Sequence, residues 1–179
     1  MNARALGSLL AGAGVMPLTA VPADVLVRGV RIDSRSVKPG DLFFALRGTE
    51  DDGARHARHA AKNGAVAVIA DSPAPEPEPG VPWVRVAEAR LAMGLCAREW
   101  FGRPDEAMTL VGITGTKGKT TVAFLVESIA AAAGRHAGRI GTVGYAFGGR
   151  ETETARTTPE ATELYELLAS MRESNTPYL

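Results

Sequence analysis

A glycine- and threonine-rich segment, residues 112–121, is the strongest constraint on what this chain can fold into. The apolar residues 108–113 before it have the length and branching of a buried β-strand. In residues 122–133 the apolar side chains recur at helical spacing, and Gly134 is suited to a helix C-cap. The segment therefore joins a predicted strand to a predicted helix, which is the context that a phosphate-binding loop requires.

The residue types of this segment suit nucleotide phosphates. Gly115 and Gly118 lack Cβ atoms, so the backbone can curl and present its N–H groups to phosphate oxygens at the positive end of the following helix. Lys119 would lie along the β- and γ-phosphates, and the Thr120 hydroxyl would bind Mg²⁺. The general P-loop pattern has a glycine where this chain has Ile113, so the motif is a variant.

A turn that only joins a strand to a helix is the alternative interpretation. The chain has only four lysines, and two of them, Lys117 and Lys119, lie in this segment. That concentration of positive charge favours phosphate binding over a plain connection.

Composition limits the other functions. With 179 residues the chain can form one domain or two small ones. A net charge of zero argues against a nucleic-acid or membrane surface. Cys96 is the sole cysteine, so no internal disulfide is possible, a reducing compartment fits, and we expect a buried, unreactive thiol. Residues 5–16 loosely resemble a secretory signal, but interrupting glycines favour a short amphipathic helix through Leu6, Leu9 and Leu10, and no stretch is long enough to span a membrane.

The first hundred residues alternate predicted strands and helices, which indicates an α/β fold. Strands are predicted at residues 25–32, 41–46, 65–70 and 83–86. Helices are predicted at residues 54–63 and 87–101, the second with Leu91, Ala92 and Leu95 on its buried face. The proline-rich residues 72–82 are predicted to form a surface loop within the first domain.

Residues 102–106 are short, polar and helix-breaking, so we place a domain boundary there, between residues 1–104 and residues 105–179. Beyond the glycine-rich segment, residues 137–143 are predicted to form the second strand of a βαβ unit. A hairpin or loop is expected at residues 145–154, turning at Gly148 and Gly149, and an amphipathic helix at residues 158–172, capped by Thr158.

Several of these motifs, taken in order, resemble the Mur ligases. The motifs span residues 33–45, 48–53, 112–121, 141–145 and 157–160, and the resemblance covers residues from about 25 to 172. Within the family, the Ile-Thr-Gly-Thr-Lys-Gly-Lys-Thr-Thr and Thr-Thr-Pro-Glu motifs are most similar to the ligases that add the third amino acid of the peptidoglycan precursor, and differ from the ligase that adds the terminal dipeptide.

The resemblance implies a small N-terminal α/β domain that binds a UDP-sugar, followed by the beginning of a P-loop NTPase-like central domain with a parallel sheet. It implies ATP and Mg²⁺ as cofactors, a cytoplasmic monomer, and UDP-N-acetylmuramoyl-L-alanyl-D-glutamate with an amino acid, meso-diaminopimelate or L-lysine, as substrates. Of these two amino acids, the composition of the chain favours meso-diaminopimelate over L-lysine. Neither a nucleic acid nor a membrane is an expected partner.

The resemblance also implies roles for individual residues. Lys119 would be catalytic, and Thr120 would bind the metal. The nucleotide would contact Gly115, Thr116, Lys117, Gly118, Lys119, Thr120 and Thr121. The UDP-sugar would contact Ile32, Ser34, Thr49, Glu50 and Asp51, and its muramoyl-peptide part would contact Thr157 and Thr158. Arg156 stands where some relatives carry a smaller polar residue, which argues against a substrate contact at that position.

Structural explanations compete with several of these roles. Asp33 and Ser34 could form only a turn, and Thr158 only a helix cap; the resemblance favours ligand contact at Ser34 and leaves Thr158 open. His56 and His59 are three residues apart on a predicted helix, but no further ligand completes a zinc set, so we expect solvent-facing histidines.

In the mechanism that the resemblance implies, ATP phosphorylates the D-glutamyl carboxylate, and the amine of an amino acid attacks the resulting acyl phosphate. The second magnesium carboxylate, the modified lysine and the amino-acid-selecting motif of the family do not occur in these residues, so we expect that the 179 residues alone do not complete the ligation. A binding-only module for a UDP-sugar and an unrelated P-loop ATPase are the alternative functions.

Overall fold

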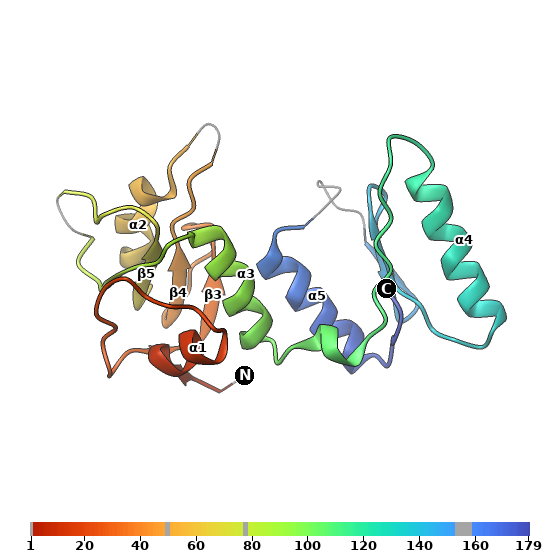
Figure 1. Cartoon of the computed structure of the whole chain (residues 1–179), viewed down its shortest axis with the longest axis horizontal. Helices are drawn as coiled ribbons and strands as arrows, with labels where there is room; N and C mark the ends of the chain where they lie inside the picture. Colours follow the sequence, from red (N-terminus) through yellow and green to blue (C-terminus); the bar gives the residue numbers. More distant parts are fainter. Residues whose placement is uncertain (1, 49–50, 77–78, 153–158) are drawn as a thin grey trace. The chain divides into compact units, whose positions relative to one another are not determined.

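The computed structural model describes residues 2–48, 51–76, 79–152 and 159–179, and the chain divides into two compact units, Met1–Trp100 and Phe101–Leu179 (Figure 1). Both units combine helices with sheets, so the mixed α/β class predicted from the sequence is confirmed. Among the described residues, no helix is both long and apolar enough to cross a membrane.

The first unit is built on a four-stranded parallel sheet with the strand order β3-β4-β5-β6. The strands are β3 (Gly29–Arg31), β4 (Asp41–Phe44), β5 (Ala67–Ala70) and β6 (Trp83–Arg85). Every residue of β4 and β5 is buried. Strands that are apolar on both faces are expected where helices cover both sides of a parallel sheet.

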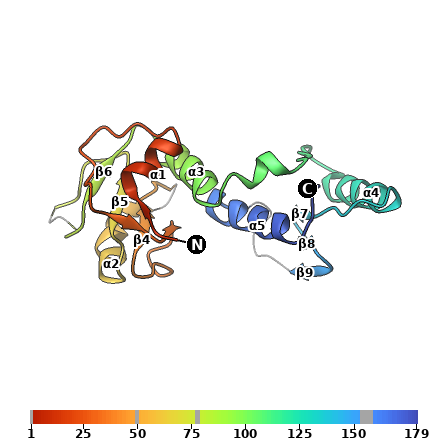
Figure 2. The same ribbon diagram turned by 90° about the horizontal axis from the view of Figure 1, so that it is seen from below.

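Helices cover the two faces of this sheet in separate layers (Figure 2). One face packs on a short 3₁₀ helix (Gly53–His56) and α2 (Ala57–Lys62), with Phe43, Ala60 and Val68 in a common core. Successive side chains of a strand point to opposite faces, so Leu42 and Phe44 face the layer of α1 (Leu6–Gly12) and α3 (Ala89–Trp100).

The predicted elements of this unit are largely confirmed. The amphipathic helix predicted near the N-terminus is α1, whose Leu6, Leu9 and Leu10 are buried. The strand predicted at residues 25–32 is instead two strands: β2 (Leu26–Val27) pairs with β1 (Arg4–Ala5), and β3 joins the parallel sheet. The chain changes partner at Arg28, whose N–H donates to the Gly40 carbonyl.

The predicted buried face of α3 was wrong in part: Ala92 is buried, as predicted, but Leu91 is not. Leu91 is 55% exposed, whereas Met93 is only 1% exposed. The buried residues of the helix are Ala89, Ala92, Met93, Cys96, Ala97 and Trp100. The helix is therefore rotated from the predicted orientation, because its small residues allow a close approach to α1 and the sheet. Cys96 is buried as predicted, and burial raises the pKa of its thiol to about 12.

The second unit contains a three-stranded antiparallel sheet, the long helices α4 (Lys119–Ala132) and α5 (Ala161–Glu173), and a 3₁₀ helix (Pro104–Ala107). The strands are β7 (Arg139–Gly141), β8 (Gly144–Phe147) and β9 (Arg150–Thr152). The predicted turn at Gly148 and Gly149 is confirmed: both have positive φ, as a tight hairpin turn requires.

Two strand predictions in this unit were wrong in part. Residues 108–113 are not a buried strand: Thr109 pairs with Tyr178, but Leu110 and Val111 are 48% and 47% exposed. Residues 137–143 do not pair in parallel with that segment. Tyr178 lies between them, bridging both Thr109 and Ala137, and β7 pairs antiparallel with β8. The tight turn between Gly141 and Gly144 pairs β7 with β8, the next strand along the chain.

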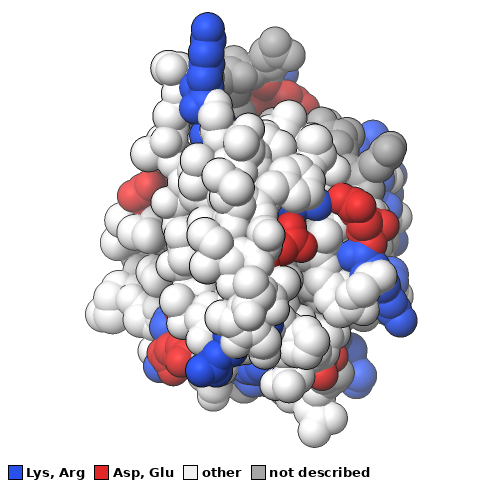
Figure 3. Space-filling model, turned by 90° about the vertical axis from the view of Figure 1, so that its right-hand side faces the viewer, with Lys and Arg blue, Asp and Glu red and all other residues white. Residues whose placement is uncertain are grey.

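Helices α4 and α5 also differ from their predictions in detail. None of the α4 residues is buried, and Phe124, Leu125 and Ile129 are exposed. The space-filling view of this side of the chain shows few charged side chains at its centre (Figure 3). Helix α5 begins at Ala161 with Glu160 as its N-cap, whereas the predicted helix begins at residue 158 with Thr158 as its cap. Thr158 itself lies outside the described residues.

Two truncations in α3 test the orientation of this helix. We expect Met93→Ala to lower the free energy of unfolding by about 2–5 kcal/mol, because it leaves a cavity beneath the helix. Leu91→Ala, the matched control two residues away, should change the free energy by less than about 1 kcal/mol. Urea denaturation of both variants measures the difference, and equal losses would contradict the observed orientation.

Candidate functional site

The first group of predicted site residues lies at one edge of the parallel sheet. Ile32 directly follows β3, and Asp51 lies in the loop that follows β4. Because β3 and β4 are parallel, their carboxyl ends open at the same edge, where ligands bind in open α/β sheets. Thr49 and Glu50 belong to the same loop but lie outside the described residues.

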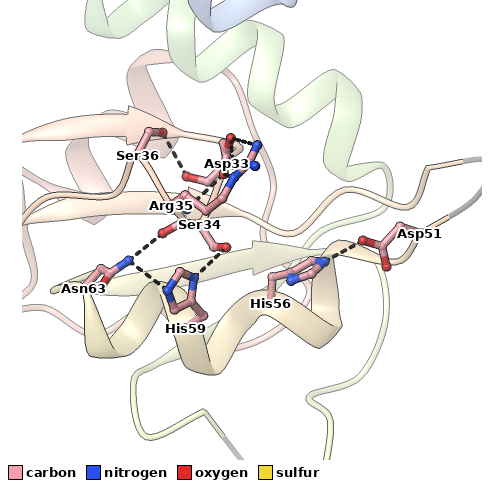
Figure 4. Close-up of polar contacts among 8 residues, drawn as sticks. All are labelled: Asp33, Ser34, Arg35, Ser36, Asp51, His56, His59 and Asn63. Carbon is pink, nitrogen blue, oxygen red and sulfur yellow. Dashed lines mark hydrogen bonds and ion pairs between the residues drawn. The ribbon is translucent and has the colours of Figure 1, made fainter.

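Ser34 is held by two residues from α2, His59 within the helix and Asn63 just after it (Figure 4). Its side chain is nearly buried, and its Oγ lies 3.0 Å from Nδ1 of His59. The Asn63 side chain donates to the Ser34 carbonyl oxygen at 2.8 Å, and the same Nδ2 lies 3.5 Å from Nε2 of His59. The position of Ser34 is therefore fixed through both its backbone and its hydroxyl.

Asp33 and Arg35 flank Ser34 and pair with each other. The Arg35 guanidinium donates to both carboxylate oxygens of Asp33, at distances from 2.7 to 3.2 Å, and the Arg35 N–H adds a further bond of 2.9 Å. These hydrogen bonds lower the pKa of Asp33 to about 2. The pair is exposed, so it shapes the turn more than it stabilises the fold.

Asp51 is bound by His56, the last residue of the 3₁₀ helix before α2. Its Oδ2 accepts a hydrogen bond from Nε2 of His56 at 2.5 Å, which lowers the pKa of the Asp51 carboxyl. His56 and His59 are exposed, as predicted, but each contacts a predicted substrate residue. Nothing in the sequence indicated that His59, expected only to face solvent, or Asn63 would contact Ser34, because Ser34 lies 25 and 29 residues before them. Among the described residues, no group of three or more His, Cys, Asp or Glu side chains could hold a metal.

The second group of predicted residues forms the loop before α4. Gly115 and Gly118 have φ values of +149° and +79°, a region that other residues rarely adopt. Gly118 is the N-cap of α4, so the Lys119 and Thr120 backbones open the helix. The Lys119 ammonium donates to the Gly115 carbonyl oxygen at 2.5 Å, across the loop.

The backbone N–H groups of this loop are available to a ligand. Within the described part of the chain, no acceptor binds the N–H groups of residues 112–118. They precede the N-terminus of a fourteen-residue helix, where the dipole favours an anion. Exposed amides, glycine conformations and a helix N-terminus together fit the phosphates of a nucleotide.

A cavity of about 390 Å³ adjoins this loop. Gly112, Ile113, Lys119 and Thr120 line one part of it. Buried Arg139 on β7 lines another part and pairs with Glu127 at 3.2 Å and Glu151 at 2.7 Å. Its guanidinium also lies 4.0 Å from the Phe124 ring, so much of its charge is compensated within the protein.

The remaining predicted residues have the following places. Thr116, Lys117 and Thr121 are exposed in the loop or the first turn of α4. Thr157 and Thr158, predicted to contact the muramoyl-peptide part of the substrate, lie outside the described residues, as does Arg156.

Comparison with known protein families matches both units. The model "Mur ligase family, catalytic domain" matches residues 26–100, and "Mur ligase middle domain" matches residues 113–179. A UDP-N-acetylmuramoyl-L-alanyl-D-glutamate--2,6-diaminopimelate ligase of Solibacter usitatus is 44% identical over 167 residues, which are 93% of this chain and 34% of that protein. The chain thus spans about a third of the length of the curated relatives it matches.

Solved structures share the fold. A UDP-N-acetylmuramoyl-L-alanyl-D-glutamate--2,6-diaminopimelate ligase matches 99% of this chain and 35% of its own length, with a TM-score of 0.78 and 23% identity. A MurF ligase from Thermotoga maritima, in complex with ADP, matches 81% of this chain and 30% of its own length, with a TM-score of 0.53 and 26% identity.

Removal of the Arg35 side chain tests the electrostatics of the Ser34 turn. We expect Arg35→Ala to raise the pKa of Asp33 from about 2 towards its ordinary value, because the charged carboxylate loses its donors. Titration of the Asp33 carboxyl carbon by NMR measures this change. Arg58→Ala, which removes an exposed arginine of α2, should leave the titration unchanged. An unaltered Asp33 titration in Arg35→Ala would contradict the assignment.

Proposed function

Because the chain belongs to the Mur ligase family, we propose that it supplies the nucleotide-sugar and ATP sites of a ligase of peptidoglycan precursor synthesis. The proposed reaction adds the third amino acid to UDP-N-acetylmuramoyl-L-alanyl-D-glutamate. In this proposal residues 1–104 bind the UDP-sugar, and residues from 105 onwards bind ATP.

The observation that carries the proposal is the loop of residues 112–118, whose N–H groups have no acceptor within the described part of the chain. A loop that only connected a strand to a helix would have no need to keep Gly115 and Gly118 at positive φ with its amides unpaired. Phosphate oxygens are the acceptors that such a loop suits. The ADP complex of the Thermotoga maritima relative supports an adenine nucleotide as the ligand.

Lys119 and Thr120 complete the proposed phosphate site. The Lys119 ammonium lies across the loop, where it would donate to phosphate oxygens and compensate the charge that develops during phosphoryl transfer. The Thr120 hydroxyl adjoins the cavity and would bind Mg²⁺, which supplies further charge compensation when bound. Gly115, Thr116, Lys117, Gly118 and Thr121 would contact the nucleotide through the loop and the first turn of α4.

The edge of the parallel sheet in the first unit is the proposed UDP-sugar site. Ile32 and Ser34 come from the end of β3, and Asp51 from the end of β4. Thr49 and Glu50 are proposed to contact the same ligand, and Thr157 and Thr158 its muramoyl-peptide part. Support for this assignment comes from the convergence of the two strand ends and from the fixed position of Ser34.

In the proposed reaction the D-glutamyl carboxylate accepts the γ-phosphoryl group of ATP, and ADP is released. The amine of the third amino acid then attacks the acyl phosphate, forms the amide bond and displaces phosphate. Diaminopimelate is the favoured amino acid over lysine, because the Solibacter usitatus relative is named for it. In this proposal the residues of the two sites position the UDP-sugar and ATP and compensate charge.

Calorimetry separates this proposal from the two alternatives. Binding of both UDP-N-acetylmuramoyl-L-alanyl-D-glutamate and Mg²⁺·ATP supports the ligase. Binding of the UDP-sugar alone supports a binding-only module, and binding of ATP alone supports an unrelated P-loop ATPase.

The Lys119→Ala variant tests the ATP site. We expect its affinity for Mg²⁺·ATP to fall at least about tenfold, because a charge-assisted hydrogen bond to phosphate is lost. Lys62→Ala, which removes an exposed lysine at the end of α2, is the charge-matched control and should bind as the parent does. Titration calorimetry of both variants gives the dissociation constants, and undiminished binding by Lys119→Ala would overturn the proposed role.

A further inference from the structure

From the contacts around Ser34, we propose that His59 is a positioning residue for nucleotide-sugar binding. It directs the hydrogen of the Ser34 hydroxyl towards an acceptor oxygen of a nucleoside diphosphate. The inference rests on the proposed function, because it concerns how Ser34 meets that ligand. His59 does not itself touch the ligand in this proposal; it acts through Ser34.

The geometry links three residues, each of which contacts the other two (Figure 4). Asn63 lies just after α2, His59 lies within α2, and Ser34 lies in the turn after β3. His59 faces its neighbours with both ring nitrogens: Nδ1 is 3.0 Å from Ser34 Oγ, and Nε2 is 3.5 Å from Asn63 Nδ2. Within the described part of the chain, His59 is the hydrogen-bond partner of the Ser34 hydroxyl.

Asn63 determines which ring nitrogen of His59 carries the proton. The Asn63 group that faces the Ser34 carbonyl oxygen must be its NH₂, because a carbonyl accepts hydrogen bonds and cannot donate them. Nε2 of His59 lies 3.5 Å from this NH₂, within reach of its second hydrogen. An Nε2–H would meet a donor there, so the arrangement favours the tautomer with its proton on Nδ1.

The tautomer in turn decides what Ser34 offers to a ligand. With the proton on Nδ1, His59 donates to Ser34 Oγ and occupies one of its lone pairs. The hydroxyl hydrogen is then free to point elsewhere and to donate. A nucleoside diphosphate presents phosphate and base carbonyl oxygens, which need donors. With the opposite tautomer, Ser34 would donate to His59 and could only accept from the ligand.

The neighbouring charged groups are already paired and do not replace His59 in this role. Asp33 is bonded to Arg35, and Asp51 is bonded to His56. Neither carboxylate is bonded to the Ser34 hydroxyl among the described residues. The direction of that hydroxyl therefore depends on the relay from Asn63 through His59.

A mutant cycle with UDP as the probe tests the relay in the 179-residue chain. We expect Ser34→Ala and His59→Ala each to weaken UDP binding about tenfold in calorimetry. The double variant should bind no more weakly than Ser34→Ala alone, because His59 acts only through the hydroxyl. His59→Asn should restore much of the affinity, because its amide places an N–H donor near the position of Nδ1. Arg58→Ala on the same helix should bind as the parent does.

The outcomes distinguish the relay from a merely structural role and from failure of the proposed function. The proposed role of His59 would be wrong if His59→Ala weakened UDP binding by the same factor in the parent chain and in Ser34→Ala. It would also be wrong if His59→Ala had no effect while Ser34→Ala weakened binding. If Ser34→Ala had no effect, or the parent chain bound no UDP, the proposed UDP site would fail instead. The ¹⁵N shifts of the His59 ring then still test the relay, since a proton on Nε2 would overturn it.

Discussion

The buried carboxylate of Asp41 is the interaction on which the first site depends. Its Oδ2 accepts a hydrogen bond from the Lys38 N–H at 2.9 Å and pairs with Arg31 Nε at 3.3 Å, so it joins β3 to β4 and closes the turn between them. Its Oδ1 occupies the space beside Gly29, where an added Cβ would lie only 2.3 Å away. A buried carboxylate is costly unless it is paired and hydrogen-bonded, so these neighbours leave the turn little freedom. The connection of residues 32–40, which carries Ser34, is therefore anchored where it enters β4.

The two proposed sites use different means to present polar groups. At the sheet edge, side chains hold one another: Asn63 fixes the Ser34 backbone and His59 its hydroxyl. In the loop before α4, the backbone itself is the binding surface, and glycine conformations set its shape. A side-chain site can be selective for the groups of a sugar nucleotide, because each donor has one direction. A backbone site recognises phosphate geometry, which many nucleotides share.

Local patterns predicted the elements well, and tertiary contacts explain the errors. The buried strands β4 and β5, helix α2 and the Gly148–Gly149 turn follow from apolar runs, glycine positions and helical spacing, which are properties of neighbours in sequence. The buried face of α3 and the partner of β7 depend on which distant segment packs there, and no periodicity encodes that choice. Likewise the residues proposed for both sites follow from motifs, but the contact of His59 with Ser34 does not. A lone histidine on an exposed helix face carries no signal of a serine 25 residues earlier.

The position of the Lys119 ammonium explains how the loop before α4 can hold its shape without a ligand and still release Lys119 to a phosphate. Its hydrogen bond to the Gly115 carbonyl oxygen draws the loop together and gives the charge an acceptor. That acceptor is neutral, whereas a phosphate oxygen is charged, so a phosphate would add the attraction of opposite charges to the hydrogen bond. A phosphate oxygen would therefore displace the carbonyl at a net gain. Because Lys119 follows Gly118 at the helix start, the exchange needs only side-chain rotation, while the amides of the loop keep their places.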